Sequence, residues 1–145
     1  MTIPTDAESS ATPIFTWRVR VYYEDTDTGG IVYYANYLRF FERARTEWLR
    51  ALGISQRQLL NEDGLQFVVR SIELQYEAPA RLDDELVLHM SLLRTGRASL
   101  WLRQTAHLAD SGATLVSGNV RIAAVNHLTG RPAGMPDWIL ERLHP

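Results

Sequence analysis

The sequence predicts an α+β fold in which a single sheet wraps around a single long helix. Three observations lead to this prediction: one long segment with helical periodicity, several segments in which apolar and polar residues alternate, and a length of 145 residues, which suits one domain. Because only one helix is available to cover the sheet, the sheet is expected to curve around it.

The N-terminal part of the chain predicts a tail followed by a strand. Residues 1–13 are polar and rich in Ser, Thr, Ala and Pro, so we expect a mobile tail, with the domain occupying residues 14–145. Trp17, Val19 and Val21 then fall on alternate positions, which predicts a first strand over residues 15–23. A cluster of Asp, Thr and Gly over residues 25–30 ends it.

The helical signal follows that cluster. Apolar residues recur at helical spacing at Tyr37, Phe41, Ala44 and Trp48, and Gly53 is placed to cap the C-terminus. A second, shorter helix is expected over residues 55–61, closed by Asp63-Gly64. A last short helix is expected over residues 136–143, with Pro136 in its first turn.

Between these helices the apolar period changes to two. Four strands are predicted by four alternating sets: Ile72, Leu74 and Tyr76; Leu86, Leu88, Met90 and Leu92; Leu100, Leu102 and Ala106; Val116, Val120, Ile122 and Ala124. Short turns between successive strands indicate an antiparallel meander. An open sheet edge, and apolar residues on both faces of several strands, favour association of copies through a continued sheet.

Composition excludes several classes of partner and site. The net charge of −2 gives no reason to expect nucleic acid or an anionic membrane as a partner. Without cysteine the chain has no disulfide, thiolate nucleophile or cysteine zinc site, which agrees with a reducing compartment. No apolar run reaches the ~18 residues of a membrane helix and the N-terminus lacks the features of a signal peptide, so we expect a cytoplasmic protein.

The chemistry-bearing residues concentrate just before the long helix. Glu24, Asp25 and Asp27 lie within four positions and are followed by Gly29 and Gly30. Glycines let the backbone turn sharply, and a helix start offers unpaired N–H groups with partial positive charge. A carboxylate beside such donors suits acyl transfer, because the donors hold a carbonyl oxygen as it gains charge. The same composition is common in turns and caps, so this pattern alone leaves both interpretations open.

Other hydrolase signatures are missing. None of the four histidines has a metal-ligand spacing, which disfavours a zinc or iron hydrolase. There is no Gly-x-Ser-x-Gly elbow of a serine hydrolase. We therefore expect neither a metal nor a separate cofactor.

Three motifs together carry a family resemblance. They are Tyr22–Asp27 with Gly30–Tyr33, Phe41–Arg50, and Tyr76–Asp84. In order and spacing they resemble the hotdog-fold acyl-CoA thioesterases of the 4-hydroxybenzoyl-CoA thioesterase family, and look closest to the YbgC-like, Tol–Pal-associated branch. The resemblance covers roughly residues 17–126.

This resemblance implies a hotdog fold, with a five-stranded antiparallel sheet around the long helix, and hydrolysis of acyl-CoA to a free acid and coenzyme A. It implies Asp27 as the catalytic carboxylate and the backbone N–H near Tyr34 as the group that polarises the thioester carbonyl. Coenzyme A enters only as part of the substrate. Sites in related enzymes lie at a dimer interface, so a homodimer or a dimer of dimers is expected. The resemblance also implies four residues that line the site: Gly30, Val32, Tyr33 and Asn36.

The chain departs from the branch at one position. The branch often has histidine where Tyr34 stands, whereas 4-hydroxybenzoyl-CoA enzymes can have tyrosine. Because the donor in this role is backbone, activity need not be lost, but a side-chain role at position 34 and the acyl preference stay open.

Several roles also stay open at this stage. Asp27 is a nucleophile or a general base. Asp25 is expected in the turn, Glu24 in solvent, and Asn36 either caps the helix or orders water. A non-catalytic hotdog module that binds acyl-CoA or a protein is the alternative function. A hotdog dehydratase is disfavoured because neither the Asp27 loop nor the long helix contains histidine. Candidates for contacts to the phosphates of coenzyme A are Arg94, Arg97, Arg103 and Arg121.

Overall fold

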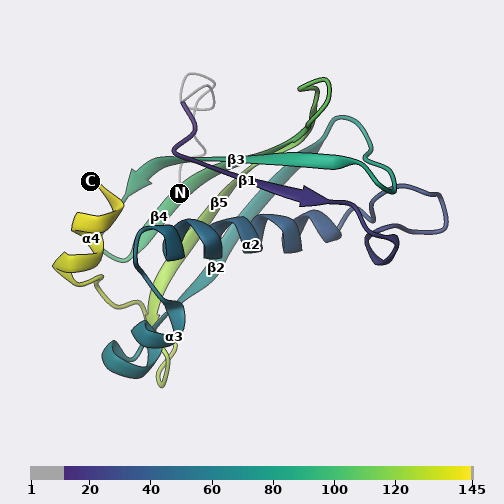
Figure 1. Cartoon of the computed structure of the whole chain (residues 1–145). Helices are drawn as coiled ribbons and strands as arrows, with labels where there is room; N and C mark the ends of the chain where they lie inside the picture. Colours follow the sequence, from purple (N-terminus) through teal and green to yellow (C-terminus); the bar gives the residue numbers. More distant parts are fainter. Residues whose placement is uncertain (1–11, 145) are drawn as a thin grey trace.

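The long helix lies against the inner face of a five-stranded antiparallel sheet that curves around it (Figure 1). This is a computed structural model, and it describes residues 12–144. The expected tail over residues 1–13 thus falls almost entirely outside the described residues. The elements are β1 (Phe15–Arg20), η1 (Tyr23–Asp25), α2 (Asn36–Ala51), α3 (Gln56–Gln58), η2 (Leu59–Asp63), β2 (Leu65–Tyr76), β3 (Glu85–Thr95), β4 (Ser99–Leu108), β5 (Thr114–Asn126) and α4 (Asp137–Leu143).

The helices begin and end close to the predicted positions. α2 buries the stripe that its sequence predicts, including Phe41, Ala44 and Trp48. Leu52 is its C-cap and Gly53 follows in the left-handed region at φ 79°, the conformation that favours glycine. The shorter second helix is also confirmed, since Ser55 caps it by accepting a hydrogen bond from the Gln58 N–H.

The order of strands across the sheet is β1-β3-β4-β5-β2. Strands β3, β4 and β5 form the expected meander, but the prediction is wrong for β2, which pairs with β5 instead of β3. The physical reason lies in the connection over residues 77–84. Its backbone bonds the segment after β1 and the loop before α2, as in Val32 N–H to Ala80 O (2.9 Å) and Val21 N–H to Asp84 O (2.8 Å). The connection therefore crosses the molecule and does not close a β2–β3 hairpin.

β2 is longer than predicted, because a β-bulge interrupts the apolar alternation and its first half was not recognised as part of the strand. Phe67 and Val69 lie opposite Ala124 and Ile122, and Ile72 lies opposite Val120, so all of these side chains share the inner face. A register shift between Val69 and Ser71 inserts one extra residue. This changes the phase of the apolar alternation from odd to even positions, so a strict period of two loses the strand.

β1 is shorter than predicted and ends at Arg20. Val21 is fully buried, but Tyr22 and Tyr23 are exposed and the chain enters the 3-10 turn η1. Pro136 is the N-cap of α4, so this helix begins at Asp137, one position later than predicted. No helix among residues 12–144 is long and apolar enough to cross a membrane.

One long sheet edge is left open. Nothing within residues 12–144 pairs with the outer edge of β2, and its inner face stays partly uncovered, with Val69 47% and Ile72 36% exposed. The core lies between α2 and the inner faces of the other strands, and it includes Phe41, Leu88 and Leu102.

Candidate active site

The Asp27 loop presents one carboxylate to the surface. The Asp27 N–H bonds the Ile31 carbonyl (2.9 Å), and the Gly30 N–H bonds the Asp27 carbonyl (3.0 Å), which closes a tight turn. The Gly29 N–H donates to Asp27 Oδ1 at 2.9 Å, while Oδ2 accepts no hydrogen bond from the described residues. Gly30 adopts φ 78°, which a side chain would disfavour. Asp27 is thus oriented by the backbone, with one oxygen left for another molecule.

Asp25, two residues earlier, has the opposite environment. Its side chain is buried, and its carboxylate accepts bonds from the Tyr22 N–H (2.8 Å) and the Asn36 side-chain amide (2.9 Å). The Asp25 carbonyl also accepts the Tyr33 N–H (2.9 Å). Asp25 therefore ties the loop to the first residue of α2, in agreement with its expected turn role, and Glu24 is exposed. The Asn36 side chain is used in this tie.

The start of α2 has free backbone donors. Its N-cap, Ala35, has no side chain that can accept a hydrogen bond. Within the described part of the chain, the N–H groups of Tyr34 and Ala35 have no acceptor, whereas the Asn36 N–H bonds the Tyr33 carbonyl (2.8 Å). The Tyr34 carbonyl accepts a bond from the Tyr76 hydroxyl at 2.8 Å. The Asp27 loop is thus followed by two backbone N–H groups, those of Tyr34 and Ala35, that are unpaired among the described residues, and they lie at the positive end of the α2 dipole.

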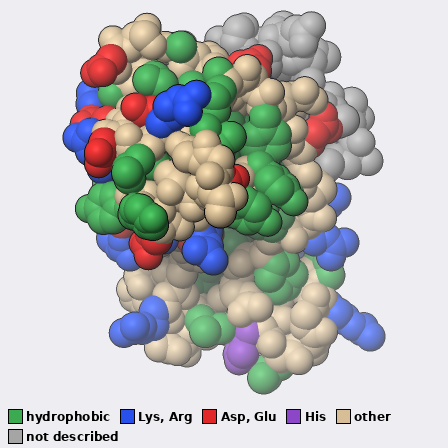
Figure 2. All heavy atoms as spheres, turned by 90° about the vertical axis from the view of Figure 1, so that its right-hand side faces the viewer, with side chains coloured by type: hydrophobic (Ala, Val, Ile, Leu, Met, Phe, Trp, Pro, Cys, Tyr) green, Lys and Arg blue, Asp and Glu red, His purple; other side chains and the backbone are tan. Residues whose placement is uncertain are grey.

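An apolar groove of about 270 Å³ adjoins these donors. Figure 2 shows hydrophobic side chains gathered on this end of the molecule, with acidic and basic side chains among them. Tyr76 meets the rings of Tyr34 and Tyr37 edge-on, with centroids 6.3 and 5.9 Å apart. The groove is lined by Ile31, Val32, Tyr34, Tyr37, Tyr76, Glu77, Ala78 and Pro79.

Only some of the site residues predicted from the sequence lie at this groove. Val32 and Tyr34 line the groove, while Gly30, Tyr33 and Asn36 do not. Asp27 lies beside it, joined to the lining residue Ile31 by the backbone hydrogen bond of the turn. Tyr37 and Tyr76 also line the groove, although neither was predicted as a site residue from the sequence. The sequence signal that could have identified Tyr76 is its place as the first residue of the third family motif. Only the fold brings that motif to the Asp27 loop.

Tyr37 and Tyr76 stay protonated at neutral pH. Burial is the main cause that raises the pKa of Tyr37 and of Tyr76 above the usual value near 10. The pKa of exposed Tyr33 is raised chiefly by the adjacent Tyr34 hydroxyl, with a smaller contribution from the negative charge of Asp27. The Tyr76 hydroxyl is therefore a hydrogen-bond donor under ordinary conditions.

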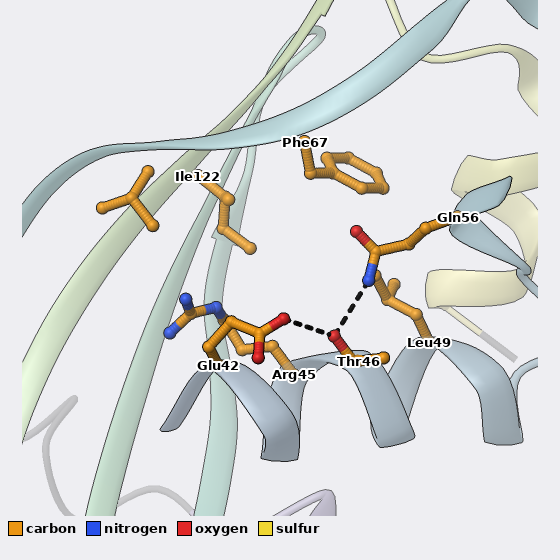
Figure 3. A pocket seen from close by; sticks show the side chains of 8 residues that line it. Glu42, Arg45, Thr46, Leu49, Gln56, Phe67 and Ile122 are labelled. Atoms are coloured by element: carbon orange, nitrogen blue, oxygen red, sulfur yellow. Dashed lines mark hydrogen bonds between the residues drawn. The ribbon is translucent and has the colours of Figure 1, made fainter. Parts of the chain in front are cut away.

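A second, smaller cavity of about 110 Å³ lies toward the other end of α2 (Figure 3). Gln56 donates to the Thr46 hydroxyl, which donates to Glu42, each at 2.9 Å. Arg45 is buried and donates to the Gln104 side-chain carbonyl (2.9 Å), and burial lowers its pKa. Its lining residues are Glu42, Arg45, Thr46, Leu49, Gln56, Phe67, Val69 and Ile122. None of the predicted site residues is among them.

Three of the four arginine candidates, Arg94, Arg103 and Arg121, share one face of the sheet. Leu100, Leu102 and Gln104 of β4 are buried toward α2, so Trp101 and Arg103 project from the opposite, outer face. Arg94 and Arg121 stack on the Trp101 ring, with guanidinium carbons 4.6 and 5.1 Å from its centroid. These arginines therefore occupy the outer face of the sheet. Within residues 12–144, no group of three or more His, Asp or Glu side chains could hold a metal ion.

The comparison with a family model and the comparison with known proteins agree with each other. The model of the Thioesterase-like superfamily matches residues 21–143. An acyl-CoA thioesterase YbgC from Haemophilus influenzae is 40% identical over 130 residues, which cover 90% of this chain and 94% of that protein. An acyl-CoA thioester hydrolase YbgC from Escherichia coli is 43% identical over 129 residues, covering 89% and 95%.

A solved structure of a probable thioesterase from Bartonella henselae superposes with a TM-score of 0.78 at 36% identity, covering 83% of this chain and 98% of that one. The match to the family model extends from the end of β1 to the end of α4 and includes the Asp27 loop, α2 and four of the five strands. The chain belongs to the thioesterase-like superfamily and has its hotdog fold.

Proposed function

We propose that the chain is an acyl-CoA thioesterase, which hydrolyses the thioester of acyl-CoA to a free acid and coenzyme A. One observation carries the proposal. The surface carboxylate of Asp27 lies in the loop before α2, and the N–H groups of Tyr34 and Ala35, just before that helix, have no acceptor within residues 12–144; the apolar groove is lined by Ile31 and Tyr34 of the same segment. The names of the relatives at 40–43% identity support the same activity.

The arrangement provides the two elements that thioester hydrolysis needs. The groove takes the apolar acyl group, and the N–H of Tyr34 donates to the carbonyl oxygen as negative charge develops on it. Such a donor typically contributes roughly 3 kcal/mol to transition-state stabilisation. Because this donor is backbone, tyrosine at position 34 retains it.

Asp27 acts by one of two routes. As a general base it removes a proton from water, the hydroxide adds to the carbonyl carbon, and the C–S bond breaks to release the thiolate of coenzyme A. As a nucleophile its carboxylate displaces the thiolate to form a mixed anhydride, which water then hydrolyses. In single-turnover hydrolysis in ¹⁸O-labelled water, enzyme oxygen in the product identifies a mixed anhydride that water cleaves at the Asp27 carboxyl carbon, because the general-base route gives a product whose new oxygen comes only from water.

We further propose that the protein works as a homodimer, with β2 of two copies continuing one sheet. The support is the open edge of β2 and the exposed apolar side chains of its inner face. In such a dimer the partner would border the α2–β2 side of the molecule. The cytoplasmic location expected from the sequence stays a prediction, which cell fractionation would check.

Release of coenzyme A from a panel of acyl-CoAs, followed with a thiol reagent, tests the function. The chain has no cysteine, so the reagent reports only the product. We expect turnover by the wild type and a loss of at least ~100-fold in kcat for Asp27→Asn, which keeps the size of the side chain but removes its basicity.

Circular dichroism and the thermal midpoint are the control for folding of this variant. Wild-type kcat in Asp27→Asn would remove Asp27 from the mechanism. Binding of acyl-CoA without turnover of any member of the panel would instead identify a non-catalytic binding module.

A further inference from the structure

The first turn of α2 lacks the usual means of fixing its backbone. A Ser, Asp or Asn at the N-cap would hold the turn but would also occupy its N–H groups. Ala35 stands at this position, and the N–H groups of Tyr34 and Ala35 have no acceptor in the part of the chain that the structure describes. Some other contact must then orient the peptide groups that carry them, since unpaired helix ends fray.

Two hydrogen bonds supply that orientation, one to each peptide group. In a trans peptide the C=O and the following N–H point in opposite directions. The bond from the Asn36 N–H to the Tyr33 carbonyl (2.8 Å) therefore fixes the direction of the Tyr34 N–H. The bond from the Tyr76 hydroxyl to the Tyr34 carbonyl (2.8 Å) likewise fixes the direction of the Ala35 N–H.

Tyr76 is itself held by the sheet. It is the last residue of β2 and lies opposite Val116 of β5, and the next residue bonds the Leu115 carbonyl through the Glu77 N–H (2.8 Å). Its ring packs edge-on against the rings of Tyr34 and Tyr37. A side chain anchored in this way transmits the rigidity of the sheet to a helix start 42 residues away in the sequence.

We propose that Tyr76 is a positioning residue that aims the Ala35 N–H, beside the Tyr34 N–H, at the thioester carbonyl. The inference rests on the proposed thioesterase function and extends it, because it makes the carbonyl site a pair of backbone donors and assigns the second donor to Ala35. Tyr76 acts through the backbone and transfers no proton.

Tyr76→Phe is the test, because it removes the hydroxyl and keeps the ring. We expect kcat for acyl-CoA to fall roughly 10-fold, less than for loss of a whole donor, with KM within twofold of the wild type. Tyr22→Phe is the matched control: it removes the hydroxyl of an exposed tyrosine at the same end of the molecule and is expected to leave kcat unchanged.

A binding comparison separates positioning from a general effect on the groove. Two inert analogues of the same chain length are used: a ketone, in which CH₂ replaces the thioester sulfur and the carbonyl remains, and an S-alkyl coenzyme A, which has no carbonyl. Tyr76→Phe is expected to weaken the ketone several-fold and to leave the thioether unchanged. Equal weakening of both analogues, or an unchanged kcat, overturns the role of Tyr76 while the thioesterase function stands. Absence of turnover by the wild type overturns the function and this inference together.

Discussion

Asp25 and Asp27 are chemically identical and two positions apart, yet the fold gives them different environments. Asp25 is 8% exposed and both of its carboxylate oxygens accept hydrogen bonds from the protein. Asp27 is exposed, and among residues 12–144 only Oδ1 of its carboxylate accepts a hydrogen bond, from the Gly29 N–H. A buried, fully bonded carboxylate maintains structure, whereas an exposed one with a free oxygen is available for chemistry.

Substitution of each aspartate by asparagine separates these roles. An amide at position 25 replaces one acceptor by a donor, so the Tyr22 N–H or the Asn36 amide loses its partner in a buried setting. We expect Asp25→Asn to lower the free energy of unfolding by about 1–3 kcal/mol, and Asp27→Asn to change it by less than about 0.5 kcal/mol. Urea unfolding at constant pH measures both, and equal values for the two variants would contradict the assignment.

At the scale of elements, the β2–β5 pair decides where the groove lies. Gly118 of β5 lies opposite Leu74 of β2, and a Cβ added to it would come within 2.4 Å of the Glu73 carbonyl oxygen and of a Leu74 methyl group. No side chain fits at this position without moving β2. Because Gly118 has no side chain, β2 can lie close to β5 near the C-terminal end of β2, where the Tyr76 hydroxyl bonds the Tyr34 carbonyl just before α2.

Gly118→Ala is therefore expected to destabilise the protein by about 1–3 kcal/mol through overpacking. The midpoint of urea unfolding, at an unchanged m-value, measures this loss. Gly134→Ala serves as the matched control, since the nearest atom to its added Cβ is Arg97 Nε at 3.0 Å, on a flexible side chain that can move. A loss for Gly118→Ala no larger than for the control would show that β2 can shift freely.

For the whole molecule, the partly uncovered inner face of β2 is the feature that bears on assembly. Val69 and Ile72 lie on this face, exposed beside the cavity between α2 and β2. Monomeric proteins usually protect a long sheet edge with charges, proline or a covering element. The exposed apolar residues of this strand favour a second copy as its cover.

The double variant Val69→Lys/Ile72→Lys is expected to convert a dimer into a monomer, because each lysine would bring a charge into the contact between copies. Light scattering after size-exclusion chromatography measures the mass. Gln75→Lys adds a charge to the opposite face of the same strand and is the control expected to stay dimeric. A wild type that is already monomeric, or a double variant that stays dimeric, would refute association through β2.

The sequence by itself determined the α+β class, the long helix, the strands β3, β4 and β5, and the family. These features are local, because side-chain period, turn residues and capping glycines act over a few positions. The stripe of Phe41, Ala44 and Trp48 predicted α2, and the alternation of Leu86, Leu88 and Met90 predicted β3. The Asp27 loop could also be singled out from the sequence, through its motif.

Only the tertiary structure decided how separated segments meet. It placed β2 beside β5, because the connection over residues 77–84 bonds the Asp27 loop and closes no hairpin. It distinguished Asp25 from Asp27 by burial, and it brought Tyr76 to the Tyr34 carbonyl. Hydrogen bonds and burial depend on partners far away in the chain, and no local pattern encodes which partner a residue will find.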